Sequence, residues 1–371
     1  MAKKFDHLYE RITSSGNLFA AFQKAARGKR GQPPVARFDF DLEDNIFALQ
    51  EELHNKTYRP GAYCSFYILD PKRRLVSAAP FRDRVAHHAL CNVLEPIFER
   101  TFIGDCYANR LGKGNHRAVR RAQEFARQYP FVLHCDVCQF FPSIDIAILR
   151  GILQRKIADA DTLWLCEQIL ASGEGVLAEE YQMVFFPGDD PATGEGQGLF
   201  AACRPRGLPI GNLTSQFWAN VYLNELDQFV KRKLQARAYL RYVDDFLLFD
   251  DDKNRLWEWK RAIENTLAAL RLTLHEREST VYPSRAGIPF LGFRIYPSHI
   301  LLQRKNGMAF QKRFSRWKRE MQRGQLDHAK LNERVLGWVA HAKHGDTWGL
   351  RRALLCSVRK HEGIADLYPH V

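Results

Sequence analysis

Three aspartates lie within otherwise apolar stretches of this sequence. Asp244 and Asp245 interrupt the run from Arg241 to Phe249, and Asp136 directly follows Val132-Leu133-His134-Cys135. Adjacent carboxylates are costly to bury without compensation, so a solvated acidic turn is the simplest interpretation of Asp244-Asp245 alone. A carboxylate from a second strand favours chemistry instead, because such groups can converge on two metal ions about 3.5–4 Å apart and support in-line phosphoryl transfer.

The elements expected to position these aspartates are strands. Residues 131–137 are typical of a buried strand, and residues 239–250 have the apolar, acidic, apolar pattern of a β-hairpin with Asp244-Asp245 at its turn. A helix is expected to begin near Pro142, with Ser143 or Asp145 as its cap.

The rest of the chain alternates helical and strand patterns. Helices are predicted from about Leu8 to Phe22 and over 41–55, 84–100, 117–128, 214–234, 256–270 and 331–342. Strand patterns cover 63–69 and 290–295, whereas 28–34 is expected to be an exposed arm or linker and 172–206 an inserted loop. The fold class expected from this mixture is α+β.

The composition favours a polyanionic partner. The 371 residues include 55 Lys and Arg against 42 Asp and Glu, and such an excess points to nucleic acid before a membrane. Residues 303–360 contribute 15 of the basic and four of the acidic side chains. No apolar run approaches the roughly 20 residues that cross a bilayer, and no secretory signal is recognisable, so we expect a cytoplasmic protein.

Several segments together resemble the motifs of reverse transcriptases, in that family's order. The segments DVCQFFPSID (136–145) and YVDD (242–245) resemble motifs A and C, LPIGNLTSQ (208–216) resembles motif B, and FLGF (290–293) resembles the primer grip. FRDRVAHHAL (81–90) and YANR (107–110) resemble finger motifs of bacterial retroelement enzymes. A single YVDD box would be weak support, but this ordered set is specific.

The resemblance implies a right-hand polymerase that makes cDNA on an RNA template. Its expected parts are an N-terminal arm and helix (1–59), fingers (60–130), a palm of antiparallel sheet and helices (131–295), and a basic helical thumb (296–371). The form of motif B is similar to that of diversity-generating retroelements, and antiphage-defence lineages share much of the pattern. The first group implies a basic accessory protein as partner and the second a non-coding RNA.

The resemblance also implies roles for individual residues. Asp136, Asp244 and Asp245 would be catalytic and, with Val137, would hold two Mg²⁺ ions, or Mn²⁺ in their place; Mg²⁺ prefers hard oxygen ligands. The incoming dNTP would meet Lys72, Arg74, Phe141, Ile210, Gly211 and Gln216, with Phe141 as the steric gate against ribose. Phe290, Leu291 and Gly292 would grip the DNA primer, and template, primer or cDNA would contact Arg110, Lys312, Arg313, Arg316, Lys318 and Arg319.

One departure from the family pattern and two other functions bear on this hypothesis. The segment 274–280 lacks the lysine that the family usually has in motif D, which leaves His275 as a guess for the group that protonates pyrophosphate. A catalytically idle nucleic-acid scaffold is disfavoured by the intact aspartate set. An intron maturase is disfavoured because about 75 residues follow Phe293, which is room for a thumb but for no further DNA-binding, endonuclease or RNase H module.

Overall fold

An N-terminal lobe of helices begins the chain in the computed structural model, which describes residues 4–69, 73–186 and 204–359. The lobe contains α1 (Tyr9–Thr13), α2 (Ser15–Ala26), α3 (Pro33–Phe40), α4 (Leu42–His54) and α5 (Phe81–Glu99). The helical pattern expected from about Leu8 to Phe22 is present as α1 and α2, and Leu18 and Phe22 are buried where α2 packs on α5. Residues 27–34 are exposed throughout, as expected of 28–34, although Pro33 and Pro34 already begin α3, where a missing N–H costs little.

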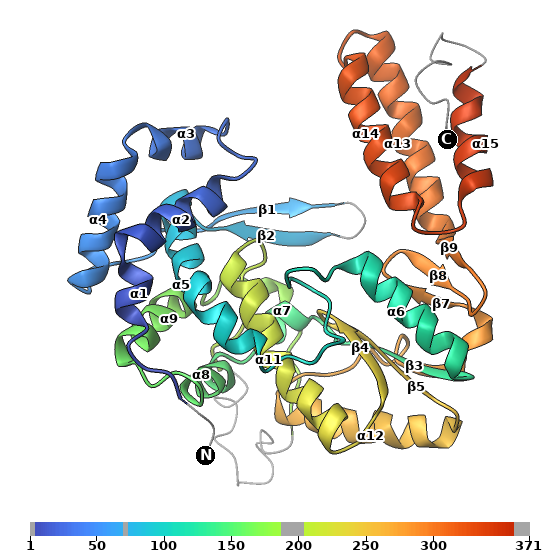
Figure 1. Cartoon of the computed structure of the whole chain (residues 1–371), viewed down its shortest axis with the longest axis horizontal. Coiled ribbons are helices and arrows are strands. Elements are labelled where there is room, and N and C mark those ends of the chain that lie inside the picture. Colours follow the sequence, from blue (N-terminus) through green and yellow to red (C-terminus); the bar gives the residue numbers. More distant parts are fainter. Residues whose placement is uncertain (1–3, 70–72, 187–203, 360–371) are drawn as a thin grey trace.

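A two-stranded hairpin leaves this lobe. Strands β1 (Cys64–Ile68) and β2 (Arg74–Ala78) pair antiparallel, with Ile68 opposite Arg74. Every residue of β1 is exposed, and the hairpin extends from the N-terminal lobe toward the C-terminal helices (Figure 1).

A four-stranded antiparallel sheet forms the centre of the molecule, in the order β4-β5-β3-β6. Its strands are β3 (Phe131–Asp136), β4 (Ala238–Tyr242), β5 (Asp245–Asp250) and β6 (Thr280–Pro283), and the helices that pack on it are α6 (Asn115–Gln128), α11 (Leu213–Arg232) and α12 (Lys253–Ala269). The predicted strand at 131–137, the hairpin at 239–250 and the long helices are confirmed.

The alternation along the strands divides the sheet into two faces. Leu133 and Cys135 of β3 share a core with α11 and α12. Val132, by contrast, packs in a second core with α6 and the strands that follow the sheet. His134 and Asp136 are two and four residues after Val132 on the same strand, so their side chains share this second face. Asp136 lies at the end of β3.

Short helices connect the central strands. They are α7 (Phe140–Ser143), α8 (Ile146–Gln154), α9 (Ala160–Ser172) and the 3₁₀ turn η1 (Ala178–Glu180). Of the two candidate caps, Asp145 caps α8 by accepting the Ile148 N–H at 2.9 Å. The expected insertion at 172–206 is irregular after η1 as far as residue 186, and 187–203 lie outside the described residues.

A small sheet carries the C-terminal helices. It consists of β7 (Ile288–Phe290), β8 (Phe293–Ile295) and β9 (Ile300–Leu302), and α13 (Arg304–Gln322), α14 (His328–Ala342) and α15 (Trp348–Arg359) follow. These three helices form the C-terminal lobe, whose core includes Phe310 stacked on Trp338 at 3.8 Å between ring centroids. The predicted apolar stripe of α14 is confirmed by buried Leu331, Val335 and Val339.

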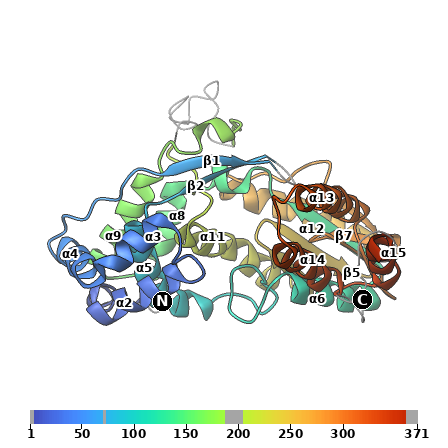
Figure 2. The same cartoon turned by 90° about the horizontal axis from the view of Figure 1, so that it is seen from above.

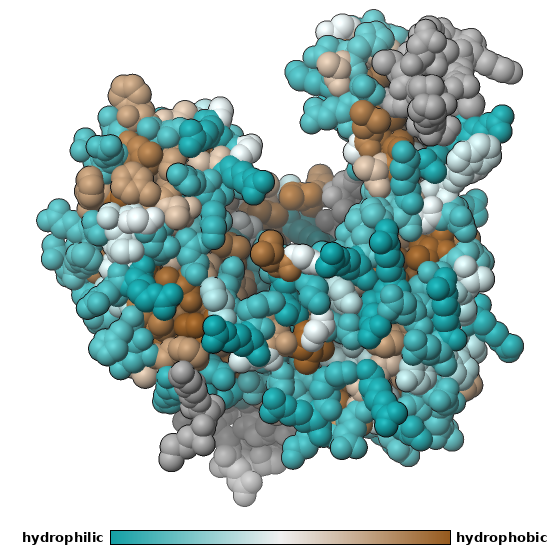
Figure 3. Space-filling view, viewed as in Figure 1, coloured by the Kyte–Doolittle hydropathy of each residue, from teal (hydrophilic) through white to brown (hydrophobic). Residues whose placement is uncertain are grey.

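The two lobes stand on opposite sides of the central sheet. Seen from above, α13 to α15 lie at one end and α2 to α4 at the other (Figure 2). The space-filling view shows a deep hollow between them, within a largely hydrophilic surface (Figure 3). Among the described helices, none is long and apolar enough to cross a membrane.

Candidate active site

The three aspartates meet where β3, β4 and β5 end. Asp136 lies directly opposite Asp245 in the β3–β5 register. Tyr242 pairs with Asp245, so Val243 and Asp244 form the two-residue turn of the β4–β5 hairpin. The Val137 N–H donates to the Asp244 carbonyl at 3.2 Å, which ties the end of β3 to this turn. The fold thus brings together the residues expected to be catalytic.

The electrostatics of this cluster show an excess of negative charge. Burial raises the pKa of Asp136 to about 7, and the charges of Asp244 and Asp245 add to the rise. Burial likewise raises the pKa of Asp244 to about 6, with Asp245 contributing and Arg74 acting in the opposite direction. A bound cation would relieve this repulsion.

The donor set fits a hard divalent cation. Carboxylate oxygens are the ligands that Mg²⁺ prefers, and Mg²⁺ commonly keeps water and substrate phosphates in its shell. Among the described residues, no three carboxylate, imidazole or thiol groups are already gathered at metal-binding distance. The fit therefore rests on the chemistry and charge of Asp136, Asp244 and Asp245.

A histidine that the sequence did not single out contacts the cluster. His134 Nε2 lies 2.8 Å from Asp245 Oδ1, and the two residues come from adjacent strands. Burial lowers the pKa of His134, but the hydrogen bond and charge of Asp245 raise it above its ordinary value overall. The sequence did contain a signal for this contact. His134 is two residues before Asp136 on a predicted strand, and residues two apart on a strand share a face.

The segment expected to grip the primer lies beside the aspartates. A cavity of about 440 Å³ is lined by Asp136 and Asp245 together with Leu291 and Gly292. Leu291 and Gly292 connect the paired residues Phe290 and Phe293, with φ of 47° and 87°, as a tight type I′ hairpin turn requires. Phe290 itself is buried in the core, so the turn is what this segment presents to the cavity.

The residues expected to bind the nucleotide approach from two sides. Arg74 on β2 is exposed and close enough to lower the pKa of Asp244. Phe141 is half-buried, and its carbonyl accepts the Leu208 N–H at 3.0 Å, which places motif A beside motif B. Gln216 lies half-buried in the first turns of α11. Lys72, which comes between β1 and β2 in the sequence, falls outside the described residues.

Motif B is joined to the β1–β2 hairpin through its backbone. The Ser77 N–H donates to the Ile210 carbonyl at 2.7 Å. Gly211 has φ of 120°, and a Cβ there would lie 2.9 Å from Val76 Cγ1, so only glycine fits. Asn212, not singled out from the sequence, is buried and accepts the Ala79 N–H at 3.0 Å while donating to the Ser77 carbonyl at 2.9 Å.

The expectation for Arg110 needs correction. Its side chain is only 7% exposed, and its guanidinium binds both carboxylate oxygens of Glu99. It also donates to the carbonyls of Ile103 at 2.6 Å and Cys106 at 2.9 Å. These contacts use the donors that would reach a phosphate, so Arg110 stabilises the connection between α5 and α6 instead of contacting nucleic acid.

The basic residues of α13 lie on and around its exposed side. Lys312, Arg313, Arg316 and Arg319 are exposed, whereas Phe310 and Phe314 are buried against α14. Lys318 differs, because its ammonium lies 5.4 Å from the centre of the Phe314 ring.

His275, the residue expected to protonate pyrophosphate, has an exposed side chain. Its contact with Asp136 is made by the backbone: the His275 N–H donates to the Asp136 carbonyl at 2.8 Å.

An antiparallel sheet with carboxylates at its hairpin turn, set between two lobes, defines a nucleic-acid polymerase of the right-hand class. A family model described as reverse transcriptase (RNA-dependent DNA polymerase) matches residues 69–295. The chain therefore belongs to the reverse transcriptase family.

Curated relatives are similar at low identity. Protein YkfC of Escherichia coli is 23% identical over 287 residues, which cover 67% of this chain and 70% of YkfC. Nuclear intron maturase 1 of Arabidopsis thaliana is 25% identical over 228 residues, covering 52% of this chain and 30% of the maturase. The group II intron-encoded protein LtrA of Lactococcus lactis is 27% identical over 249 residues, which cover 65% of this chain and 38% of LtrA. The chain thus spans well under half of the two intron proteins.

Proposed function

We propose that this protein copies an RNA template into DNA in the cytoplasm, and that Asp136, Asp244 and Asp245, with Val137 beside them, would hold two Mg²⁺ ions. The observation that carries the proposal is the cavity shared by Asp136, Asp245 and the Leu291–Gly292 turn. A primer held by that turn would present its 3′-hydroxyl to the carboxylates. Divalent ions bound there would supply activation of that hydroxyl and neutralisation of the triphosphate charge.

The same proposal assigns the lobes. Residues 60–130 are the fingers, 131–295 the palm and 296–371 the thumb, with 1–59 as a helical layer behind the fingers. Arg74 and Lys72 bind the triphosphate, for which arginine offers a planar fork and lysine a point charge. The ring of Phe141 excludes a ribose 2′-hydroxyl.

Primer extension tests the catalytic assignment. With Mg²⁺, dNTPs and a primed RNA, the wild-type protein should extend the primer, and Asp244→Asn should lose at least about a hundredfold in rate, since metal stabilisation of the transition state is worth several kcal/mol. Asp251→Asn is the matched control, because Asp251 is exposed and follows the opposite end of β5. Wild-type extension by Asp244→Asn would contradict the mechanism.

We further propose that synthesis is error-prone, as in a diversity-generating retroelement. Ile210 precedes the motif B glycine, where retroviral-type enzymes have a glutamine. A site that hydrogen-bonds its substrate rejects misfits by leaving polar groups unpaired, whereas an apolar wall discriminates by only about 1–3 kcal/mol. The hydrogen bond from the Ser77 N–H to the Ile210 carbonyl fixes the backbone at this position. The isoleucine side chain itself has no polar group that could hydrogen-bond a nucleotide.

Sequencing of cDNA tests this second proposal. Wild type should misincorporate often, most of all opposite template adenine, and Ile210→Gln should lower the error rate on the same RNA. Low and equal error rates at every template base would contradict error-prone synthesis. That outcome would favour an antiphage-defence enzyme that works with a non-coding RNA. A diversity-generating enzyme would instead copy a repeated template RNA, called the template repeat, and work with a basic accessory protein.

The relatives support a second candidate template. Two of them carry names that refer to introns, so a folded intron-like RNA is the alternative to a template repeat. Competition between the two RNAs in the extension reaction would distinguish them.

A further inference from the structure

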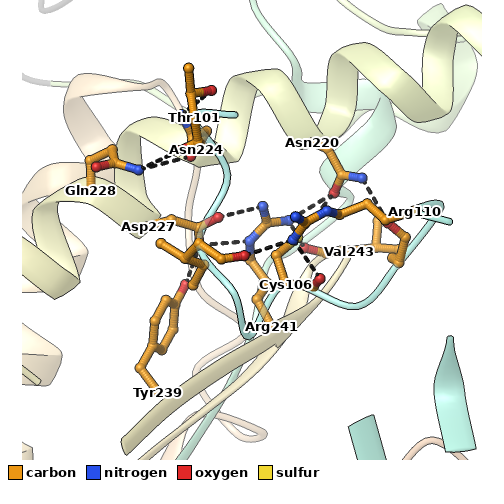
Figure 4. A network of polar contacts seen from close by, with 12 residues as sticks. Thr101, Cys106, Arg110, Asn220, Asn224, Asp227, Gln228, Tyr239, Arg241 and Val243 are labelled. Atoms are coloured by element: carbon orange, nitrogen blue, oxygen red, sulfur yellow. Dashed lines mark hydrogen bonds and ion pairs between the residues drawn. The ribbon is translucent and has the colours of Figure 1, made fainter. Parts of the chain in front are cut away.

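Strand β4 carries an arginine that is completely buried. Arg241 is the next-to-last residue of β4 and has no exposed surface. Its side chain, with that of Tyr239, points toward Asp227 of α11 (Figure 4). Arg241 pairs with Phe246, which pairs with Cys135, so it lies on the face of the sheet opposite Asp136. A buried guanidinium must be paired and hydrogen-bonded to be tolerated.

Asp227 on α11 supplies the matching charge. Its two carboxylate oxygens accept from Arg241 Nε at 2.8 Å and from Nη2 at 2.7 Å, and its side chain is also fully buried. The Tyr239 hydroxyl donates to the same carboxylate at 2.6 Å. Burial alone would lower the pKa of Arg241, but the charge of Asp227 raises it above its ordinary value, so the arginine stays charged.

The remaining nitrogen of Arg241 reaches the catalytic turn. Nη1 donates to the Val243 carbonyl at 2.8 Å and to Asn220 Oδ1 at 3.2 Å. Val243 has φ of 57°, a conformation that is unfavourable for a β-branched residue. A strained turn persists only where its surroundings hold it in place. The hydrogen bond from Arg241 does this at Val243, the residue directly before Asp244.

We propose that Arg241 is a positioning residue, anchored by Asp227, that clamps the Val243 carbonyl and thereby holds Asp244 in place for catalysis. The proposal rests on the function proposed above. Because Asp227 and Asn220 both belong to α11, whose first turns carry motif B, the clamp also fixes the catalytic hairpin relative to the helix beside the nucleotide.

The experiment removes the clamp without leaving a buried charge. The triple variant Arg241→Met, Asp227→Leu, Tyr239→Phe replaces the ion pair and its tyrosine partner with apolar side chains and leaves Asn220 in place. Replacing a buried ion pair in this way is often neutral or stabilising. We expect a folded protein whose single-nucleotide incorporation rate falls at least about tenfold while its KM for dNTP changes less than about twofold. Amide hydrogen exchange should also become faster in the peptide covering 240–249.

Tyr239→Phe alone is the matched control. It removes one donor to Asp227 but leaves the bond from Arg241 to Val243, so both the rate and the exchange of the turn should stay at wild-type values. If the triple variant does not fold, Arg241→Lys gives the same test, because a single ammonium cannot replace the planar fork that binds Asp227 and Val243 together.

Two results would overturn the clamp. One is a folded triple variant with wild-type rate and wild-type exchange at the turn. The other is Tyr239→Phe slowing catalysis as much as the triple variant, since general packing would then explain both. An inactive wild type would instead contradict the proposed function, and hydrogen exchange at the turn would still decide whether Arg241 holds it.

Discussion

Asp136, Asp244 and Asp245 repel one another, and their nearest neighbours counter that repulsion. His134 binds Asp245 at 2.8 Å, and the charge of Arg74 on β2 lowers the pKa of Asp244. Neither contact balances the three carboxylates, so the cluster remains suited to a cation.

Phe141 carries the prediction for sugar selection. Phe141→Ala should admit ribonucleotides, because removal of the ring opens space for the 2′-hydroxyl, and dNTP incorporation should continue. Competition between dNTPs and rNTPs in primer extension measures the preference. Phe140→Leu is the control: Phe140 is buried and its ring centre lies 5.5 Å from that of Phe141, so this change should cost stability and leave the preference intact. If folded Phe141→Ala keeps the wild-type preference for dNTPs over rNTPs, Phe141 contributes to packing and does not select the sugar.

At the scale of elements, the hairpin turn and the C-terminal helices are joined. The Gly292 carbonyl accepts the Gln303 N–H at 3.0 Å and Asn306 Nδ2 at 2.9 Å. The Leu291–Gly292 turn, which lines the cavity beside the aspartates, is therefore fixed to the start of α13. A movement of α13 would be transmitted to this turn, which is proposed to hold the primer.

The exposed face of α13 is predicted to follow the backbone of a duplex. Lys312, Arg316 and Arg319 are spaced to share the side of α13 that faces away from Phe310 and Phe314. Changing all three to Gln should weaken duplex binding regardless of sequence and reduce the slope of log K against log salt by about 3, if each contacts one phosphate. Binding titrations at several salt concentrations measure this slope.

The control for α13 is a matched loss of charge elsewhere. Lys253, Arg255 and Arg261 are exposed on α12, which packs on the opposite face of the sheet from Asp136. Changing these three to Gln should leave the salt slope unchanged. Equal slopes for wild type and the α13 variant would mean that this face serves another purpose.

At the scale of the whole molecule, Asn212 joins two parts of the active site. Its amide bonds Ala79 and Ser77 at the base of the β1–β2 hairpin. The hairpin carries Arg74 and motif B carries Ile210, so this contact sets the distance between two surfaces that would hold the same nucleotide.

Asn212→Ala should separate those surfaces. It leaves a buried N–H and a buried C=O without their partner, so the free energy of unfolding should fall by about 1–3 kcal/mol, and the KM for dNTP should rise. Thermal unfolding and steady-state kinetics measure the two effects. Asn17→Ala is the control, because Asn17 donates to the Ala89 carbonyl within the N-terminal lobe; it should cost stability without raising KM. A raised KM in both variants would refute the specific role of Asn212.

Local sequence patterns were enough to predict most of the elements and the convergence of the three aspartates. Apolar alternation marks β3, β4 and β5, helical spacing marks α11 and α14, and the acidic interruption at Asp244-Asp245 marks the turn between strands. These signals are local, since the period of a strand or helix is written in neighbouring residues.

Which polar side chains lie at the aspartate cluster, and which stabilise the fold elsewhere, depends on packing between distant segments of the chain. Asn212 bonds Ser77 across 135 positions of the chain, and His134 meets Asp245 across 111. Arg110 was expected to contact nucleic acid but pairs with Glu99, and Arg241, to which the sequence assigned no role, lies buried on Asp227. The physical reason is that burial and pairing of a charged group depend on which distant elements pack beside it, and that is decided only when the sheet, α11 and the two lobes come together.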